Sequence, residues 1–133
     1  MNYPLPQAAA ALALCYAHPR AAAGRIEHGK GEGMLKHIVM WKLKEQAEGA
    51  NRAANAIEMK RRLDACATIV PGILTFEVTI AQPDLEATYD VVLYSEFSDR
   101  AALEAYIRHP THQAIVPFIG AIREARQCMD YEV

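Results

Sequence analysis

The chain has 133 residues, a length that fits one domain with a substantial core and leaves room for a short tail. Its net charge of −2 argues against nucleic-acid binding, because phosphate neutralisation needs a basic surface. No apolar run approaches the roughly 20 residues that a membrane-spanning helix needs, which argues against a membrane protein. Three widely spaced cysteines without a CxxC pair are typical of reduced thiols, so the sequence predicts a soluble cytoplasmic domain.

Residues 1–33 differ from the rest of the chain. The apolar run Ala8–Ala17 follows no Lys or Arg, as a secretory signal would, and the segment shows no strand pattern. We therefore expect a poorly structured N-terminal extension, either a short frayed helix or disorder. The codons for residues 29–33 must be purine-rich, as a bacterial ribosome-binding site is. We hypothesise that Met34 is the natural start and that residues 34–133 form the domain.

From residue 34 the chain shows clear secondary-structure patterns. Residues 36–43 alternate as a strand that is apolar on both faces, with one face made by His37, Val39, Trp41 and Leu43 and the other by Ile38 and Met40. Residues 49–67 predict a helix, because apolar side chains recur at helical spacing: Ala56, Met59, Leu63, Cys66 and Val70. Pro71 and Gly72 are expected to end this segment and turn the chain.

The second half of the domain predicts two strands, two helices and a last strand. Residues 73–80 and 89–97 read as strands around a turn at 82–84, the former with one face made by Leu74, Phe76, Val78 and Ile80. Ser98 is expected to cap a helix that Pro110 ends, with an apolar face of Ala102, Leu103, Tyr106 and Ile107. A shorter helix, capped by Thr111 and interrupted or kinked at Pro117, is expected to reach about Gly120. Residues 125–133 predict the last strand.

The order β-α-β-β-α-β over residues 34–133 predicts an α+β protein with the ferredoxin-like arrangement, in which both helices cover one face of a four-stranded antiparallel sheet. Large side chains from more than one strand remain on the opposite face, and an exposed apolar sheet is an association surface. A homodimer that joins sheet to sheet about a two-fold axis covers that face. A monomer requires polar residues to dominate there, namely Thr75, Glu77, Thr79 and Asp90. We favour the homodimer.

Residues 106–112 concentrate the groups that can do chemistry. Tyr106, His109 and His112 fall within seven residues, and the kink at Pro110 can turn them towards one cavity, where His37 could meet them. A neutral imidazole accepts a proton near pH 7, since its unperturbed pKa is about 6.5. A tyrosine hydroxyl can stabilise the negative charge that develops on a carbonyl oxygen. Together these groups could enolise a ketone or thioester.

A structural interpretation of the same residues stays open. His109 before Pro110 is also an ordinary helix end, where it would cap backbone carbonyls while Tyr106 packs its ring into the core. His37, His109 and His112 could ligate a metal, but no HExxH motif or carboxylate cluster accompanies them, so we predict no metal site and no cofactor.

Five segments, taken together and in order, resemble the stress-responsive A/B barrel (Dabb) family: residues 34–43, 70–73, 89–97, 106–112 and 129–133. The resemblance implies a ferredoxin-like protomer whose sheet packs against that of its mate in a dimeric α/β barrel. A polyketide cyclase of this family uses the tyrosine and last histidine of a Tyr-x-x-His-Pro-x-His motif. The resemblance therefore implies Tyr106 as the carbonyl or enolate partner and His112 as the general base, with His37 and His109 at matching, supporting positions.

Two hypotheses on function follow. The first is a homodimeric stress-response domain that binds a small apolar molecule and has no assigned activity. The alternative is an enzyme of the polyketide-cyclase or lyase type that uses His112 and Tyr106 for enolisation and aldol-type ring closure. We favour the first, because the sequence determines architecture better than chemistry.

Overall fold

The computed structural model describes residues 33–133, so the predicted N-terminal extension lies outside the described residues except for Gly33. The domain's longer elements follow one another in the predicted order, with a short two-stranded hairpin inserted after the first strand. In chain order the elements are β1 (Leu35–Leu43), β2 (Gln46–Ala47), β3 (Ala50–Asn51), α2 (Arg52–Asp64), β4 (Ile73–Ile80), β5 (Val91–Phe97), α3 (Arg100–Arg108), α4 (Pro110–Ile122) and β6 (Arg123–Glu132).

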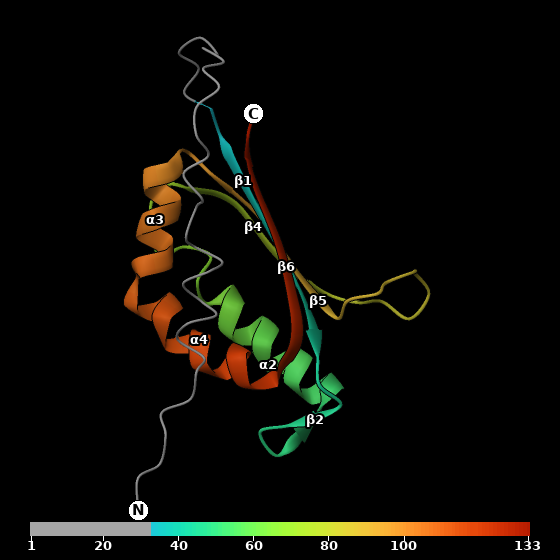
Figure 1. The fold of residues 1–133 in the computed structure, drawn as a ribbon. Helices are drawn as coiled ribbons and strands as arrows, with labels where there is room; N and C mark the ends of the chain where they lie inside the picture. Colours follow the sequence, from blue (N-terminus) through green and yellow to red (C-terminus); the bar gives the residue numbers. More distant parts are fainter. Residues whose placement is uncertain (1–32) are drawn as a thin grey trace, which may run out of the picture. The chain divides into compact units, whose positions relative to one another are not determined.

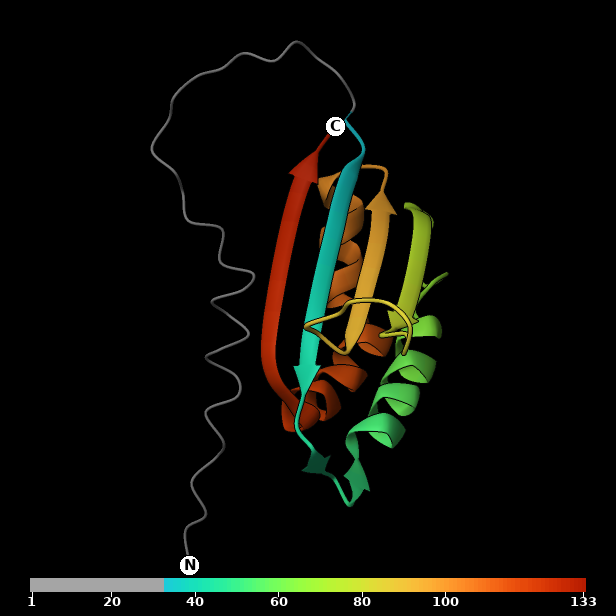
Figure 2. The same cartoon turned by 90° about the vertical axis from the view of Figure 1, so that its right-hand side faces the viewer.

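The main sheet has the strand order β4-β5-β1-β6, and every neighbouring pair in it is antiparallel. Helices α2, α3 and α4 lie together on one face of this sheet, and the opposite face carries no helix (Figures 1 and 2). This arrangement confirms the predicted α+β, ferredoxin-like fold. No helix among residues 33–133 is long and apolar enough to cross a membrane.

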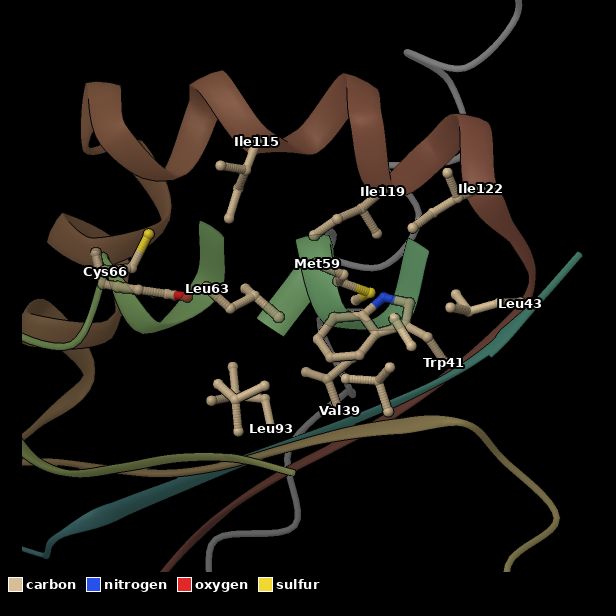
Figure 3. Close-up of a cluster of buried hydrophobic side chains, with 14 of the residues drawn as sticks. Val39, Trp41, Leu43, Met59, Leu63, Cys66, Leu93, Ile115, Ile119 and Ile122 are labelled. Atoms are coloured by element: carbon tan, nitrogen blue, oxygen red, sulfur yellow. The ribbon is translucent and has the colours of Figure 1, made fainter. Parts of the chain in front are cut away.

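The core lies between the sheet and the helices. Strand β1 alternates as predicted, and the side chains that it turns to the helices are buried: Leu35, His37, Val39, Trp41 and Leu43. Met59 and Leu63 of α2 meet three isoleucines of α4 above this strand, Ile115, Ile119 and Ile122 (Figure 3). The predicted apolar stripe of the first helix is thus confirmed for Ala56, Met59 and Leu63, whereas Cys66 and Val70 lie beyond the end of the helix.

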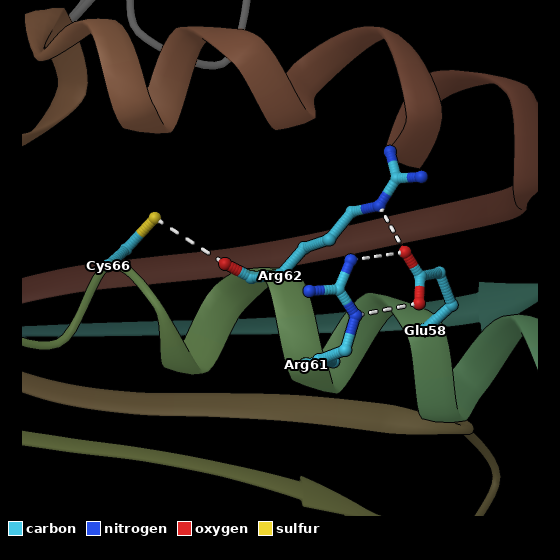
Figure 4. A network of polar contacts seen from close by, with 4 residues as sticks. All are labelled: Glu58, Arg61, Arg62 and Cys66. Carbon is cyan, nitrogen blue, oxygen red and sulfur yellow. Dashed lines mark hydrogen bonds and ion pairs between the residues drawn. The ribbon is translucent and has the colours of Figure 1, made fainter.

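Charged side chains hold α2 and α4 together at their outer edge. Glu58 accepts hydrogen bonds from both Arg61 and Arg62, at 2.7 Å in each case (Figure 4). The guanidinium of Arg62 lies 3.9 Å from the centre of the Phe118 ring, on α4. Glu58 thereby orients Arg62, and the stacking of Arg62 on Phe118 joins α2 to α4.

Three strand predictions need correction, and the first of these is the last strand, which runs over Arg123–Glu132 instead of residues 125–133. A bulge between Ile73 and Thr75 breaks the alternation of β4, so Leu74 leaves the predicted apolar face and is 57% exposed. The third long strand begins at Val91 instead of residue 89. Just before this strand, the carboxylate of Asp90 accepts a hydrogen bond from the backbone N–H of Leu43.

The helix ends also differ from the predictions. Asp99 caps α3 instead of Ser98, because its carboxylate reaches the N–H of Ala102. His109 takes the capping position predicted for Thr111. Helix α4 runs past Gly120 to Ile122, since its buried isoleucines hold the helix on the core although Pro117 removes one hydrogen bond.

The first helix starts later and ends earlier than predicted, over Arg52–Asp64. Residues Glu48 and Gly49 have φ values of 50° and 73°, which close the hairpin between β2 and β3. Asn51 then caps α2 by accepting a hydrogen bond from the N–H of Ala54. The hairpin therefore takes up the residues that the helical pattern had included.

Candidate functional site

His112 lies on the first turn of α4, between the helices and the sheet, and is only 7% exposed. Its Nδ1 is 3.0 Å from the carbonyl oxygen of Ile107. A carbonyl only accepts, so Nδ1 carries the proton and Nε2 of the neutral ring keeps its lone pair. Burial lowers the pKa of His112 to about 4; nearby His37 and Arg126 act in the same direction, and the Ile107 hydrogen bond opposes them. His112 is therefore a neutral, weakly basic imidazole at pH 7.

Tyr106 lies against His112 and is 1% exposed. The centres of the two rings are 4.6 Å apart, and the ring planes are tilted by 50°. Phe97 and Phe76 pack on the other sides of the tyrosine ring, with centres 5.3 and 5.8 Å away. Tyr106 is thus a core residue that also borders the imidazole of His112.

His37 faces the same interior from β1 and forms a close pair with a carboxylate. Its Nδ1 is 2.5 Å from Oδ1 of Asp130, on the neighbouring strand β6. The contact with the carboxylate engages Nδ1 and so fixes the orientation of the ring. Nε2 is the ring nitrogen that this contact does not use. Asp130 could not be identified from the sequence, because only the register of β1 against β6 places it opposite His37.

His109 stands apart from the other three predicted residues. It lies at the junction of α3 and α4, and its Nδ1 accepts a hydrogen bond of 3.1 Å from the N–H of Thr111. This contact gives His109 a capping position. The structure therefore brings His37, Tyr106 and His112 to the helix-covered side of the sheet, and places His109 at a helix end.

The sheet face that carries no helix is called here the open face. By the alternation of the four strands it consists of Lys36, Ile38, Met40, Lys42, Thr75, Glu77, Thr79, Val92, Tyr94, Glu96, Ala125, Gln127, Met129 and Tyr131. Apolar side chains of β1, β5 and β6 are among them, and Met40 and Met129 are 38% and 65% exposed. The open face is thus a mixed surface with a clear apolar share.

A polar cluster lies across three strands of the open face. The Tyr94 hydroxyl donates to Glu96 at 2.5 Å, and Thr75 donates to the other carboxylate oxygen at 2.9 Å. These hydrogen bonds, that from Tyr94 first, lower the pKa of Glu96 below its usual value. The Lys36 ammonium lies 3.8 Å from the Glu96 carboxylate. It also lies 5.8 Å and 6.0 Å from the centres of the Tyr94 and Tyr131 rings, within the range of a cation–π contact. The cluster satisfies its own polar groups.

A pocket of about 400 Å³ lies at one end of the open face, beneath the connection between β4 and β5. Met40, Thr79 and Val92 line it from the sheet, and Leu85 and Tyr89 line it from the connection. None of the four predicted site residues lines this pocket. The sequence predicts a cavity between helix and sheet, whereas this pocket lies on the open face.

Within residues 33–133 no group of three or more His, Cys, Asp or Glu side chains is arranged to hold a metal ion. Cys66 is buried just after α2, its Sγ donates to the carbonyl of Arg62, and burial raises the pKa of its thiol. Cys128 is exposed on β6. Burial makes Cys66 a poor nucleophile, in agreement with its interpretation as a core residue.

Comparison with known proteins gives a family and a set of related structures. The family model described as Stress Responsive A/B Barrel Domain matches residues 35–133. A dimeric protein of unknown function with a ferredoxin-like fold from Bacteroides fragilis is 30% identical, with a TM-score of 0.65 over 75% of this chain and 96% of that chain. A dimeric ferredoxin-like protein of unknown function from Jannaschia sp. is 31% identical, with a TM-score of 0.59 over 76% of this chain and 100% of that chain.

A third structure carries the family's own description. It is a Dabb family protein with a ferredoxin-like fold from Mesorhizobium loti, 26% identical, with a TM-score of 0.57 over 74% of this chain and 95% of that chain. The chain matches none of the curated proteins with which it was compared.

Proposed function

This chain belongs to the stress responsive A/B barrel domain family, and from that premise we propose that it acts as a homodimer whose two open faces pack together and enclose a small apolar molecule. The observation that carries the proposal is the open face itself. It is a full sheet face without helices, and it carries apolar side chains on three strands: Ile38, Met40, Val92, Tyr94, Ala125 and Met129. A second copy provides an equally shaped surface about a two-fold axis.

The polar residues of the open face are compatible with burial. Glu96 is already paired with Tyr94, Thr75 and Lys36, so covering this cluster leaves few polar groups unsatisfied. Asp90, which the monomer alternative counted among the polar residues of this face, instead bonds to the backbone of Leu43. Two relatives with 30% and 31% identity are described as dimeric, which also supports the proposal.

Substitution on the open face tests the homodimer directly. Met129→Glu places an unpaired carboxylate in the proposed interface. Ile57→Glu, on α2, is the control, because the side chains of Met129 and Ile57 are almost equally exposed, at 65% and 66%. Met129→Glu should raise the dimer dissociation constant by about tenfold or more, because burying an unpaired charge is costly. Ile57→Glu should leave it unchanged. Sedimentation equilibrium measures both, and equal effects would contradict an open-face dimer.

The bound molecule is tested on the purified full chain. Ile38 lies in the middle of the open face, between Tyr94 and Met129, so two such faces that meet would enclose an apolar space there. Native mass spectrometry should therefore detect a dimer that carries an extra small-molecule mass, extractable into organic solvent. Ile38→Lys should lose this mass. A dimer of exactly twice the chain mass, with nothing extractable, would contradict the ligand.

A second candidate function is proton transfer at a carbonyl compound, and one observation favours it. Tyr106 and His112 are in ring contact, and His37 with its Asp130 partner faces the same interior. His112 carries a free Nε2 lone pair by its hydrogen bonding, as a general base requires. The low pKa of His112, about 4, makes it a weak base in the closed core, so we rank this function second.

Solvent deuterium exchange into the α-carbon of an acetoacetyl thioester, followed by NMR, tests this second function without knowledge of the substrate. Wild-type protein should accelerate the exchange and His112→Ala should abolish the acceleration. His109→Asn is the matched control, because asparagine keeps a capping group at the start of α4. Equal rates for wild type and His112→Ala would remove His112 from the role of base.

A further inference from the structure

The connection between β4 and β5, residues 81–90, forms an arm that projects from the sheet on the side of the open face (Figures 1 and 2). Residues 81–88 of this arm are all exposed. Its base is nevertheless fixed. Ala81 donates to the carbonyl of Asp90 at 2.8 Å, and Asp90 donates to the carbonyl of Trp41 at 2.9 Å. The arm therefore has a fixed base and an exposed outer part that is accessible to another molecule.

The carboxylate of Asp90 strengthens this anchor from two directions. It accepts a hydrogen bond of 2.7 Å from the N–H of Leu43, and the Arg52 guanidinium lies 4.0 Å away. The base of the arm is therefore tied to the end of β1 and to the start of α2. Because the base is ordered by these contacts, less conformational entropy is lost when the arm binds a partner.

The outer part of the arm has the composition of a contact surface. Leu85 is 66% exposed and stands between the acidic residues Asp84 and Glu86. The arm contains no basic residue. The open face carries Lys42, an exposed cation that makes no ion pair within the part of the chain that the structure describes. The face also carries Glu77, which is exposed and makes no ion pair within the described residues, so the charge complementarity is local to Lys42 and the acidic tip.

The pocket beneath the arm is continuous with the open face. Met40, Thr79 and Val92 belong to both, and Leu85 and Tyr89 overhang them from the arm. Its volume, about 400 Å³, is enough for several side chains of a packed protein. Anything that covers the open face therefore also meets the arm and the space beneath it.

Resting on the open-face homodimer proposed above, we propose that the arm is a dimer clasp. It reaches across the second copy of the chain, packs Leu85 on the open face of that copy, and receives part of the second copy in the pocket beneath the arm. The occupant of the pocket is thus a second copy of this chain. The two-fold axis gives each dimer two such contacts, so a change in Leu85 acts twice.

The test compares substitutions of two exposed aliphatic residues of equal size, Leu85 and Ile57. Leu85→Ser alters the clasp, and Ile57→Ser alters a side chain of equal exposure, 66%, on α2. Sedimentation equilibrium of the full chain should show that Leu85→Ser raises the dimer dissociation constant by about tenfold or more, because two apolar side chains lose their burial. Ile57→Ser should change it less than about twofold. Thermal unfolding checks that both variants keep their fold.

A photo-crosslinker provides a measurement that does not depend on a weakened dimer. Benzoyl-phenylalanine at position 85 should produce a covalent dimer on illumination, and the same residue at position 57 should not. A wild-type dimer with equal dissociation constants for Leu85→Ser and Ile57→Ser, and no crosslink from position 85, would overturn the clasp while the homodimer stands. A wild-type chain that stays monomeric at all concentrations would overturn the homodimer and the clasp together.

Discussion

At the scale of single residues, the two histidines of the interior have different partners. His37 is buried against a carboxylate, Asp130, whereas His112 is buried against the carbonyl oxygen of Ile107. Burial lowers the pKa of His112, and the hydrogen bond to Ile107 only partly opposes this, so the neutral form is favoured. The burial that weakens His112 as a base also means that protonation of His112 lowers the free energy of unfolding.

This burial predicts a specific pH dependence of stability. The pKa of His112 is about 4 in the folded protein and about 6.5 in the unfolded chain. The unfolded chain therefore binds more protons below pH 6.5, and stability is lost as the pH falls from about 6.5 towards 4. His112→Gln, which cannot titrate, should lose roughly 2 to 3 kcal/mol less than wild type between pH 7 and 4.5. Urea unfolding at both pH values measures this.

The control for this experiment is Ile57→Ser, an exposed site on the outer side of α2, which should keep the wild-type difference between the two pH values. If His112→Gln loses as much stability as wild type on acidification, His112 is not buried in its neutral form. Comparison of the two variants separates His112 from the other groups that titrate in the same range.

At the scale of elements, two glycines differ in how closely other segments approach them. A Cβ atom on Gly72 would lie 2.3 Å from Cβ of Ala102 and 2.8 Å from Oγ of Ser98, where the chain after α2 passes the start of α3. The carbonyl of Gly72 also accepts a hydrogen bond from the N–H of Ser98. Gly120, within α4, has nothing within 4 Å of such an atom. Glycine is required by packing at the first position and tolerated at the second.

Alanine at the two positions should therefore act in opposite directions. Gly72→Ala should lower the free energy of unfolding by about 1 to 3 kcal/mol, because α3 must shift to admit the methyl group. Gly120→Ala should raise it by up to about 1 kcal/mol, since alanine is the better helix former. Chemical denaturation of both variants measures the difference. A Gly72→Ala protein as stable as wild type would show that α3 does not approach Gly72 this closely.

At the scale of the whole molecule, the sheet separates the two regions for which functions are proposed above. The buried pair Tyr106 and His112 lies on the helix-covered side, and the open face with its arm lies on the other. Strand β1 takes part in both, with His37 facing one side and Met40 the other. The two regions thus share one strand, β1.

A homodimer makes thermal stability depend on concentration. Because association stabilises only the folded chains, the Tm of wild type should rise as the protein concentration is raised over about a hundredfold range. Met129→Glu should flatten this dependence, and Ile57→Glu should not, since only the first alters the open face. Differential scanning calorimetry at several concentrations measures the shifts. A wild-type Tm that is constant over this range would contradict association of the folded chain.

Local patterns in the sequence were enough to predict most of the fold. The alternation of β1, the stripe Met59 to Leu63 and the helix end before Pro110 depend on neighbours along the chain, and the structure confirms each. The family resemblance, found from short segments in order, is confirmed over residues 35–133.

Only the tertiary structure decided what depends on contacts between distant segments. The pairing of β1 with β6 places Asp130 opposite His37, which no periodicity within either strand reveals. The choice of Asp99 over Ser98 as a cap depends on where the chain after α2 passes. The turn predicted at 82–84 is confirmed by the hydrogen bond from the N–H of Leu85 to the carbonyl of Gln82, whereas the contacts that join Asp90 to β1 and α2 are between distant segments. Periodicity is a property of one segment, whereas register, capping and loop direction are decided between segments.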